Sequence, residues 1–181
     1  VLVIGLGDIG TSFAAKMKAL GCRTIGVKRR VGDKPEAVDE LYGMEELDNL
    51  LPRADVVAMS LPGNPSTYHV LNRERIALLS SNAIVLNAGR GTAIDTDALS
   101  DALYEGKIAG AALDVTDPEP LPAEHPIWKA PGAIITPHIS GGYALPETLQ
   151  QIAEIFADNL RRYQAGEPLK NVIDLETGYC K

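Results

Sequence analysis

Two patterns of apolar and polar residues alternate along the chain. Short, almost continuously apolar runs are typical of strands that are buried on both faces of a parallel sheet. Such runs predict strands over 1–4, 24–27, 56–61, 83–88, 108–115 and 133–136. Between them, apolar residues recur at helical spacing, which predicts a helix through 13–20 and others over 44–51, 73–79, 95–105 and 146–164. This alternation indicates an α/β protein with a parallel sheet and right-handed connections.

The first turn after the first apolar run reads Gly5-Leu6-Gly7-Asp8-Ile9-Gly10, a G-x-G-x-x-G sequence between a strand and a helix. In a dinucleotide-binding fold the first glycine permits a tight turn, the second lets a pyrophosphate approach the backbone, and the third lets the helix pack on the strand. The helix N-terminus then offers free N–H groups to the phosphates. We therefore predict a Rossmann-type doubly wound sheet with helices on both faces. Asp8 and Ile9 belong to the same cofactor loop, with the Asp8 side chain directed to solvent.

The positions of the charged residues along the chain are more informative than the net charge. The chain has a net charge of −7, with 24 acidic and 17 basic side chains, which argues against nucleic-acid binding. Yet residues 16–34 hold seven basic side chains and one acidic one, which indicates a local anionic ligand.

The basic run includes Lys28-Arg29-Arg30, directly after the predicted second strand. A fold selective for NAD carries an acidic residue there, which would repel a 2′-phosphate, whereas three cations attract one. We therefore favour NADP(H) as the cofactor and keep NAD(H) as the alternative.

Three polar segments follow later strands, at 87–91, 114–120 and 136–142. The carboxyl ends of parallel strands share one edge of a sheet, so Arg90, Glu119 and His138 are expected to meet beside the glycine loop. This set suits hydride chemistry on a 2-keto acid. An arginine can hold the carboxylate, a histidine can donate a proton to the carbonyl oxygen, and a glutamate can stabilise the imidazolium.

The segments N-x-G-R-G, D-V-x-x-x-E-P, H-P-I-W and T-P-H-I-x-G, together with Gly5–Gly10 and Leu61-Pro62, occur in this order from residue 1 to about 172. The chain thereby resembles the cofactor-binding domain of the D-isomer-specific 2-hydroxyacid dehydrogenases. The resemblance implies that Arg90 binds substrate, that His138 is the acid/base and that Glu119 is its partner. It also implies a cofactor-binding set made of Leu61, Pro62, Thr67, Asn87, Ala88, Gly89, Asp114 and Gly141, in which Asp114 contacts the nicotinamide amide.

Two positions depart from the family pattern. Lys28 replaces the common Asp, as in the family's NADPH-using reductases, and Gly63-Asn64-Pro65 stands where Leu-Thr-Pro is more usual. Residues 1–172 are expected to form the dinucleotide-binding domain, with the last helix inside it. Residues 173–181 are expected to begin a return to a substrate domain. Because Val1 lies inside an apolar run without an initiator Met, we expect the natural chain to begin upstream.

Several functional expectations follow from the resemblance. The leading one is NADP(H)-dependent reduction of a small 2-keto acid such as glyoxylate or hydroxypyruvate. The alternatives are an NAD-dependent D-3-phosphoglycerate or D-lactate type dehydrogenase and, in another class, a corepressor-like module that senses dinucleotides. The family also implies a homodimer.

Other residues narrow the setting of the protein. His69 and His125 do not lie in a motif with other candidate catalytic residues, so we assign them no chemistry. The two cysteines, Cys22 and Cys180, form no zinc or disulfide framework and fit a reducing, cytoplasmic setting, so we assign no metal. No apolar run is long enough for a membrane span.

Overall fold

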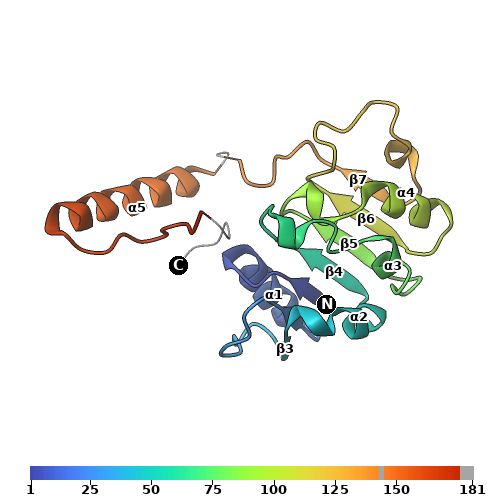
Figure 1. Cartoon of the computed structure of the whole chain (residues 1–181), viewed down its shortest axis with the longest axis horizontal. Coiled ribbons are helices and arrows are strands. Elements are labelled where there is room, and N and C mark those ends of the chain that lie inside the picture. The colour runs from blue at the N-terminus through green and yellow to red at the C-terminus, as the bar shows by residue number, and fades with distance from the viewer. Residues whose placement is uncertain (143–144, 176–181) are drawn as a thin grey trace. The chain divides into compact units, whose positions relative to one another are not determined.

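The computed structural model describes residues 1–142 and 145–175 (Figure 1). It contains two compact units, Val1–His138 and Ile139–Lys181, and each is described by itself. The boundary lies within the segment 136–142, so the candidate residues up to His138 belong to the first unit.

The first unit is built on a parallel sheet of seven strands in the order β3-β2-β1-β4-β5-β6-β7. The strands are β1 (Leu2–Ile4), β2 (Ile25–Val27), β3 (Glu40–Tyr42), β4 (Val56–Met59), β5 (Ile84–Asn87), β6 (Gly110–Leu113) and β7 (Ala133–Ile135). The order runs one way from β1 to β3 and the other way from β4 to β7, which confirms the doubly wound sheet. The pattern of apolar residues predicts each of these strands except β3, which lies at the edge of the sheet.

The helices are α1 (Asp8–Ala19), α2 (Leu47–Leu50), α3 (Arg73–Ile76) and α4 (Thr96–Tyr104) in the first unit and α5 (Pro146–Ala165) in the second. They lie where the helical spacing predicts them, although α2 and α3 are single turns. α4 begins at a cap in which the Asp95 carboxylate accepts a hydrogen bond from the Ala98 amide. Among the described residues, no helix combines the length and the apolar character that a membrane crossing requires.

The main core lies on one face of the sheet. Alternate strand residues such as Ile4, Val57 and Val85 pack there against Leu47 of α2 and Leu99 of α4. On the opposite face α1 packs over β1, where Val3, Ala14 and Val38 form a smaller buried cluster. Helices therefore cover both faces, and this arrangement holds the carboxyl ends of the strands in one row.

Asp39 joins three elements near the edge of the sheet. Its carboxylate accepts hydrogen bonds from the amide of Thr24 at 2.8 Å and from the Thr24 hydroxyl at 3.2 Å, and it pairs with Lys18 of α1 at 2.9 Å. The hydrogen bond from the Thr24 amide, followed by that from Lys18, lowers the pKa of Asp39 to about 2. Asp39 thus ties β2 and α1 to the start of β3.

This lowered pKa predicts a pH-dependent stability. The folded-state pKa of Asp39 lies below the ordinary value of 3.8. The carboxylate therefore stabilises the fold above about pH 4, and this contribution is lost as the pH falls through 2. The free energy of unfolding of Asp39→Asn, measured with urea, should lie below that of the unaltered chain at pH 7, and the gap should narrow toward pH 2. A gap of constant size would contradict this role, and Asp33→Asn, on the exposed turn after β2, is the matched control.

The second unit consists of α5 and the segment that follows it. α5 ends at Gly166, which adopts a left-handed conformation with φ of 70°. The chain then returns along the helix, because the Asn159 side chain bonds both the amide of Lys170 (2.8 Å) and its carbonyl (3.2 Å). Lys170 also pairs with Asp158 at 2.8 Å, and that contact contributes most to lowering the pKa of Asp158 to about 2. The apolar residues on the predicted face of α5 are exposed in this unit, among them Leu149 and Phe156.

Candidate active site

The glycine loop connects β1 to α1 with the geometry that a phosphate-binding turn requires. Gly5 has a φ of +95°, which favours glycine, and a Cβ on Gly10 would lie 1.9 Å from the carbonyl oxygen of Gly5. Nothing lies within 4 Å of the Cβ position of Gly7, which precedes α1 without a side-chain cap. The loop therefore fits a pyrophosphate, because it leaves open space at Gly7 and free N–H groups at the start of α1.

Ser60 supports this loop from the end of β4, and sequence analysis did not single it out. Its hydroxyl donates a hydrogen bond of 2.9 Å to the carbonyl of Gly5. Ser60 also lines an apolar hollow of about 250 Å³ beside the loop. The hollow extends from Ile9 and Gly10 to Asp114 and Thr136.

The turn formed by Lys28, Arg29 and Arg30, the basic turn, lies beside the glycine loop. The amide of Gly5 donates a hydrogen bond of 2.9 Å to the carbonyl of Val27, the last residue of β2. Lys28, the next residue, is half-buried, and Arg29 and Arg30 are exposed. The turn thus places three cations next to a loop shaped for phosphate, which raises the local positive potential.

The segment after β4 places the backbone of Leu61 against the loop that carries Arg90. Leu61 is buried, and a Cβ on Gly89 would lie 2.6 Å from the Leu61 amide nitrogen. Farther on, the Thr67 hydroxyl donates to the carbonyl of Pro62 at 2.6 Å and accepts from the amide of Asn64. Thr67 is buried, and its hydroxyl makes these hydrogen bonds within its own segment. The structure therefore supports a role for Thr67 in shaping that segment.

Asn87 holds the loop that carries Arg90. Its amide nitrogen donates to the carbonyl of Arg90 and its amide oxygen accepts from the amide of Gly89, both at 3.0 Å. The Arg90 side chain is exposed, and its Nη1 donates to the carbonyl of Gly89 at 2.8 Å. Ala88 is exposed on the same loop. The buried Asn87 side chain is therefore used by the loop itself, which fixes the backbone from which Arg90 extends.

His138 and Glu119 form the ion pair that the sequence predicts. His138 Nδ1 lies 2.5 Å from Glu119 Oε1, and the two side chains are 49% and 39% exposed. Because a carboxylate only accepts, Nδ1 carries the proton. His138 has a φ of 53°, and its amide donates a hydrogen bond of 2.8 Å to the carbonyl of Asp114. The backbone of His138 is therefore held in the less common left-handed region by a bond to Asp114, the residue after β6.

Asp114 stands between two hollows. It is buried, and its carboxylate accepts a hydrogen bond from the Thr136 hydroxyl at 2.5 Å. Asp114 and Thr136 line the hollow beside the glycine loop and also a second one of about 470 Å³, to which Glu119, Leu121 and His138 contribute. A ring bound in the first hollow and a small acid near His138 would therefore be neighbours.

The structure thus brings the glycine loop, Leu61, Asn87, Arg90, Asp114, Glu119 and His138 to one edge of the sheet. Gly141 belongs to the second unit, where nothing lies within 4 Å of its Cβ position. Besides Ser60, sequence analysis missed the Thr136 hydroxyl, since a lone hydroxyl residue at the end of a strand gives no signal of its own.

A twisted parallel sheet with a glycine loop at its switch point defines a dinucleotide-binding domain. The sequence profile described as "D-isomer specific 2-hydroxyacid dehydrogenase, NAD binding domain" matches residues 1–140. The chain therefore belongs to the D-isomer-specific 2-hydroxyacid dehydrogenase family, as the sequence motifs indicated.

Curated relatives fall into two groups by name. The chain is 38% identical over 167 residues to a glyoxylate reductase of Thermofilum pendens, covering 91% of this chain and 48% of that protein. It is 39% identical over 176 residues to a D-3-phosphoglycerate dehydrogenase of Methanocaldococcus jannaschii, covering 96% of this chain and 32% of that protein. The chain thus spans at most about half the length of these two relatives.

Solved structures show the same similarity. A D-isomer specific 2-hydroxyacid dehydrogenase from Xanthobacter autotrophicus Py2, in complex with NADPH and MES, matches with a TM-score of 0.89 at 37% identity, covering 99% of this chain and 72% of that one. An NADPH-dependent glyoxylate/hydroxypyruvate reductase from Sinorhizobium meliloti, in complex with NADP and sulfate, matches with a TM-score of 0.88 at 31% identity, covering 98% and 56%.

Proposed function

We propose that this chain is the cofactor-binding domain of an oxidoreductase that transfers hydride between NADP(H) and a small 2-keto or 2-hydroxy acid, with D-isomer specificity. The observation that carries the proposal is the His138–Glu119 pair, which stands on the same sheet edge as the glycine loop and Arg90. The domain would comprise residues 1–172, and residues 173–181 would begin the return to a substrate domain.

The choice of NADP(H) is supported by Lys28, Arg29 and Arg30, which take the place where an NAD-selective fold carries a carboxylate. The two structural relatives above contain NADPH or NADP by their own descriptions. Gly5–Gly10 would hold the pyrophosphate, Asp114 the nicotinamide amide, and the basic turn the 2′-phosphate; Leu61, Pro62, Thr67, Asn87, Ala88, Gly89 and Gly141 would line the rest of the groove. When bound, the reduced cofactor supplies the hydride.

The residues of this chain would provide the rest of the chemistry. Arg90 binds the carboxylate of the keto acid, which orients the carbonyl carbon. His138 presents Nε2, because Glu119 occupies Nδ1, and donates a proton to the carbonyl oxygen as the carbon is reduced. Glu119 stabilises the imidazolium before that transfer. In the reverse direction, His138 removes the hydroxyl proton.

An NAD-dependent enzyme of the D-3-phosphoglycerate dehydrogenase type is the second candidate, and relatives of that name favour it. The Methanocaldococcus protein above is one of them. A homodimer in a reducing, cytoplasmic compartment is also part of our proposal, supported by the family motifs and by the sparse cysteines.

A keto-acid panel tests the proposed function. The full-length protein that carries this domain should reduce glyoxylate or hydroxypyruvate with NADPH at a higher kcat/KM than with NADH. Oxidation of D-3-phosphoglycerate with NAD as the preferred reaction would instead favour the second candidate. No turnover of any 2-keto or 2-hydroxy acid would contradict both.

A further inference from the structure

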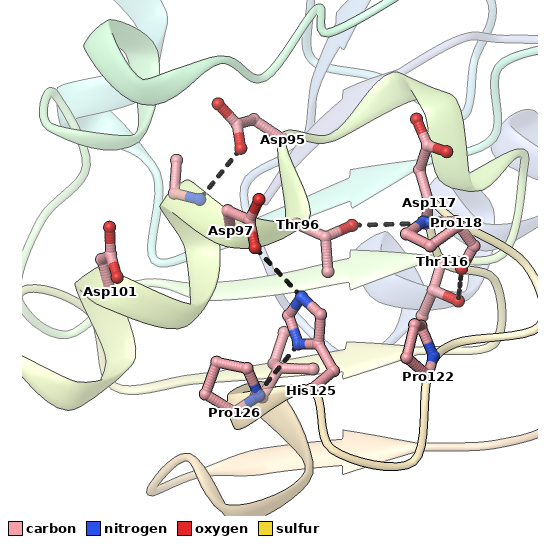
Figure 2. A network of polar contacts seen from close by, with 12 residues as sticks. Asp95, Thr96, Asp97, Asp101, Thr116, Asp117, Pro118, Pro122, His125 and Pro126 are labelled. Carbon is pink, nitrogen blue, oxygen red and sulfur yellow. Dashed lines mark hydrogen bonds and ion pairs between the residues drawn. The ribbon is translucent and has the colours of Figure 1, made fainter.

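The loop that carries Glu119 is attached to the first turn of α4 at two points (Figure 2). Near the start of the loop, the amide of Asp117 donates a hydrogen bond of 3.3 Å to the hydroxyl of Thr96, which is 5% exposed. Near its end, His125 Nε2 lies 3.1 Å from Asp97 Oδ1. Thr96 and Asp97 are consecutive residues, so one turn of helix holds both ends of the loop.

The His125 contact has a defined direction. The amide of Ile127 donates a hydrogen bond of 3.2 Å to His125 Nδ1, which caps the short 3₁₀ helix Pro126–Lys129. Nδ1 therefore acts as an acceptor and Nε2 carries the proton that is donated to Asp97. The His125 side chain is 10% exposed, whereas that of Asp97 is 83% exposed, so the bond lies at the surface while the imidazole itself is packed. His125 thus joins the end of the loop to α4 and also starts the next helical turn.

The same turn of α4 directly follows the loop of Arg90. Gly91 packs against the Glu119 loop so closely that a Cβ on it would lie 1.8 Å from the carbonyl oxygen of Thr116. The Thr116 hydroxyl in turn donates to the carbonyl of Pro118 at 2.9 Å. The loops of Arg90 and Glu119 therefore meet beside the start of α4.

We infer that the first turn of α4 is a positioning platform, and that Thr96, Asp97 and His125 are positioning residues that set Glu119 against His138. Their importance for catalysis rests on the proposed function. Their effect on the Glu119–His138 bond does not, because that bond can be observed in the chain without any substrate.

The physical need for such a platform follows from exposure. A half-exposed ion pair on its own contributes little, because solvent screens it and side-chain entropy opposes it. Glu119 lies in an exposed, proline-containing loop, so the short bond to His138 requires a backbone that is already fixed. The anchors at Thr96 and His125 fix that backbone on either side of Glu119.

Nuclear magnetic resonance on the complete 181-residue chain tests this inference. A short N–H···O⁻ bond gives the His138 Nδ1 proton a low-field resonance that exchanges slowly with water. Thr96→Val keeps the shape of the side chain but removes the acceptor. His125→Asn keeps an acceptor for the Ile127 amide but cannot reach Asp97. Each substitution should speed exchange of the His138 proton about fivefold, the worth of one hydrogen bond, and the double variant should weaken or lose the resonance.

Two variants separate positioning from general destabilisation. Thr96→Ser should restore slow exchange, because it keeps the hydroxyl. Asp101→Asn breaks the ion pair of 2.8 Å between Arg73 and the far side of α4, and it should leave the resonance unchanged. If Thr96→Val unfolds the chain, the test uses His125→Asn alone. The inference would be overturned if the unaltered chain lacked this resonance. It would also be overturned if the resonance were unchanged in the folded double variant or, where the double variant unfolds, in folded His125→Asn.

Turnover by the full-length protein distinguishes this inference from the proposed function. Loss of the anchors should lower kcat with little change in the Kd of NADPH. If the resonance responds to the anchors but the unaltered protein reduces no keto acid, the platform stands and the proposed function fails.

Discussion

Replacing His138 with alanine should lower kcat for keto-acid reduction by the full-length protein roughly 10²- to 10⁴-fold, the usual contribution of a positioned general acid. The Kd of NADPH should change little, because the cofactor is held mainly by the glycine loop and the basic turn. The physical reason is that the His138 imidazole is oriented by Glu119 at 2.5 Å. Among the described residues, it is the only histidine that bonds a carboxylate of the candidate catalytic set.

Single-turnover kinetics with each variant measure this effect. His69→Ala serves as the matched control, since the ion pair of His69 is with Asp117, at 3.9 Å, and not with one of the proposed catalytic side chains. Glu119→Gln should fall between the control and His138→Ala, because it keeps a hydrogen-bond acceptor but not the charge. Turnover by His138→Ala at the unaltered rate would remove His138 from the mechanism.

Substituting Gly10 with alanine should abolish tight cofactor binding. The added Cβ would lie 1.9 Å from the carbonyl oxygen of Gly5, so that α1 must move away from the loop. We expect a loss of stability of about 1–3 kcal/mol, which is the usual cost of overpacking. The affinity for NADPH should fall at least about 100-fold, because the phosphate-binding N–H groups move with the helix.

Two other glycines provide the comparison. Gly7→Ala should fold with nearly unaltered stability, because nothing lies within 4 Å of its Cβ position, yet it should bind NADPH more weakly, since that open space is where a pyrophosphate would approach. Gly32→Ala, which is equally open but lies outside the loop, should change neither property. Thermal unfolding and NADPH fluorescence titration separate the two effects. Tight NADPH binding by Gly10→Ala would contradict the assigned geometry of the loop.

The strands were readable from the sequence because their burial on both faces demands continuous apolar runs. β3 was missed because it has only three residues, of which Leu41 alone is aliphatic. Its pairing comes from β2 rather than from a pattern in the strand itself. The glycine loop was readable because Gly5 and Gly10 meet steric demands of the turn, while Gly7 leaves open space at the start of α1.

The site was predicted best where spacing along the chain places a residue at the end of a strand. Arg90, Glu119 and His138 were found in that way. The assignment of Asn87 and Thr67 to the cofactor groove stays a prediction, and their hydrogen bonds within their own loops could not be read from the sequence. The pairing of His125 with Asp97, 28 residues apart, depends on how a loop packs on a helix, and no local pattern encodes it.

The basic turn after β2 predicts that this domain prefers a dinucleotide with a 2′-phosphate. Fluorescence titration of the 181-residue chain with NADPH and NADH at low salt measures this preference directly. We expect NADPH to bind at least about tenfold more tightly, the worth of one hydrogen bond between charged groups. Lys28→Asp should remove this preference, whereas Lys107→Gln, which deletes an exposed charge after α4, should keep it. Equal or tighter binding of NADH by the unaltered chain would contradict the account.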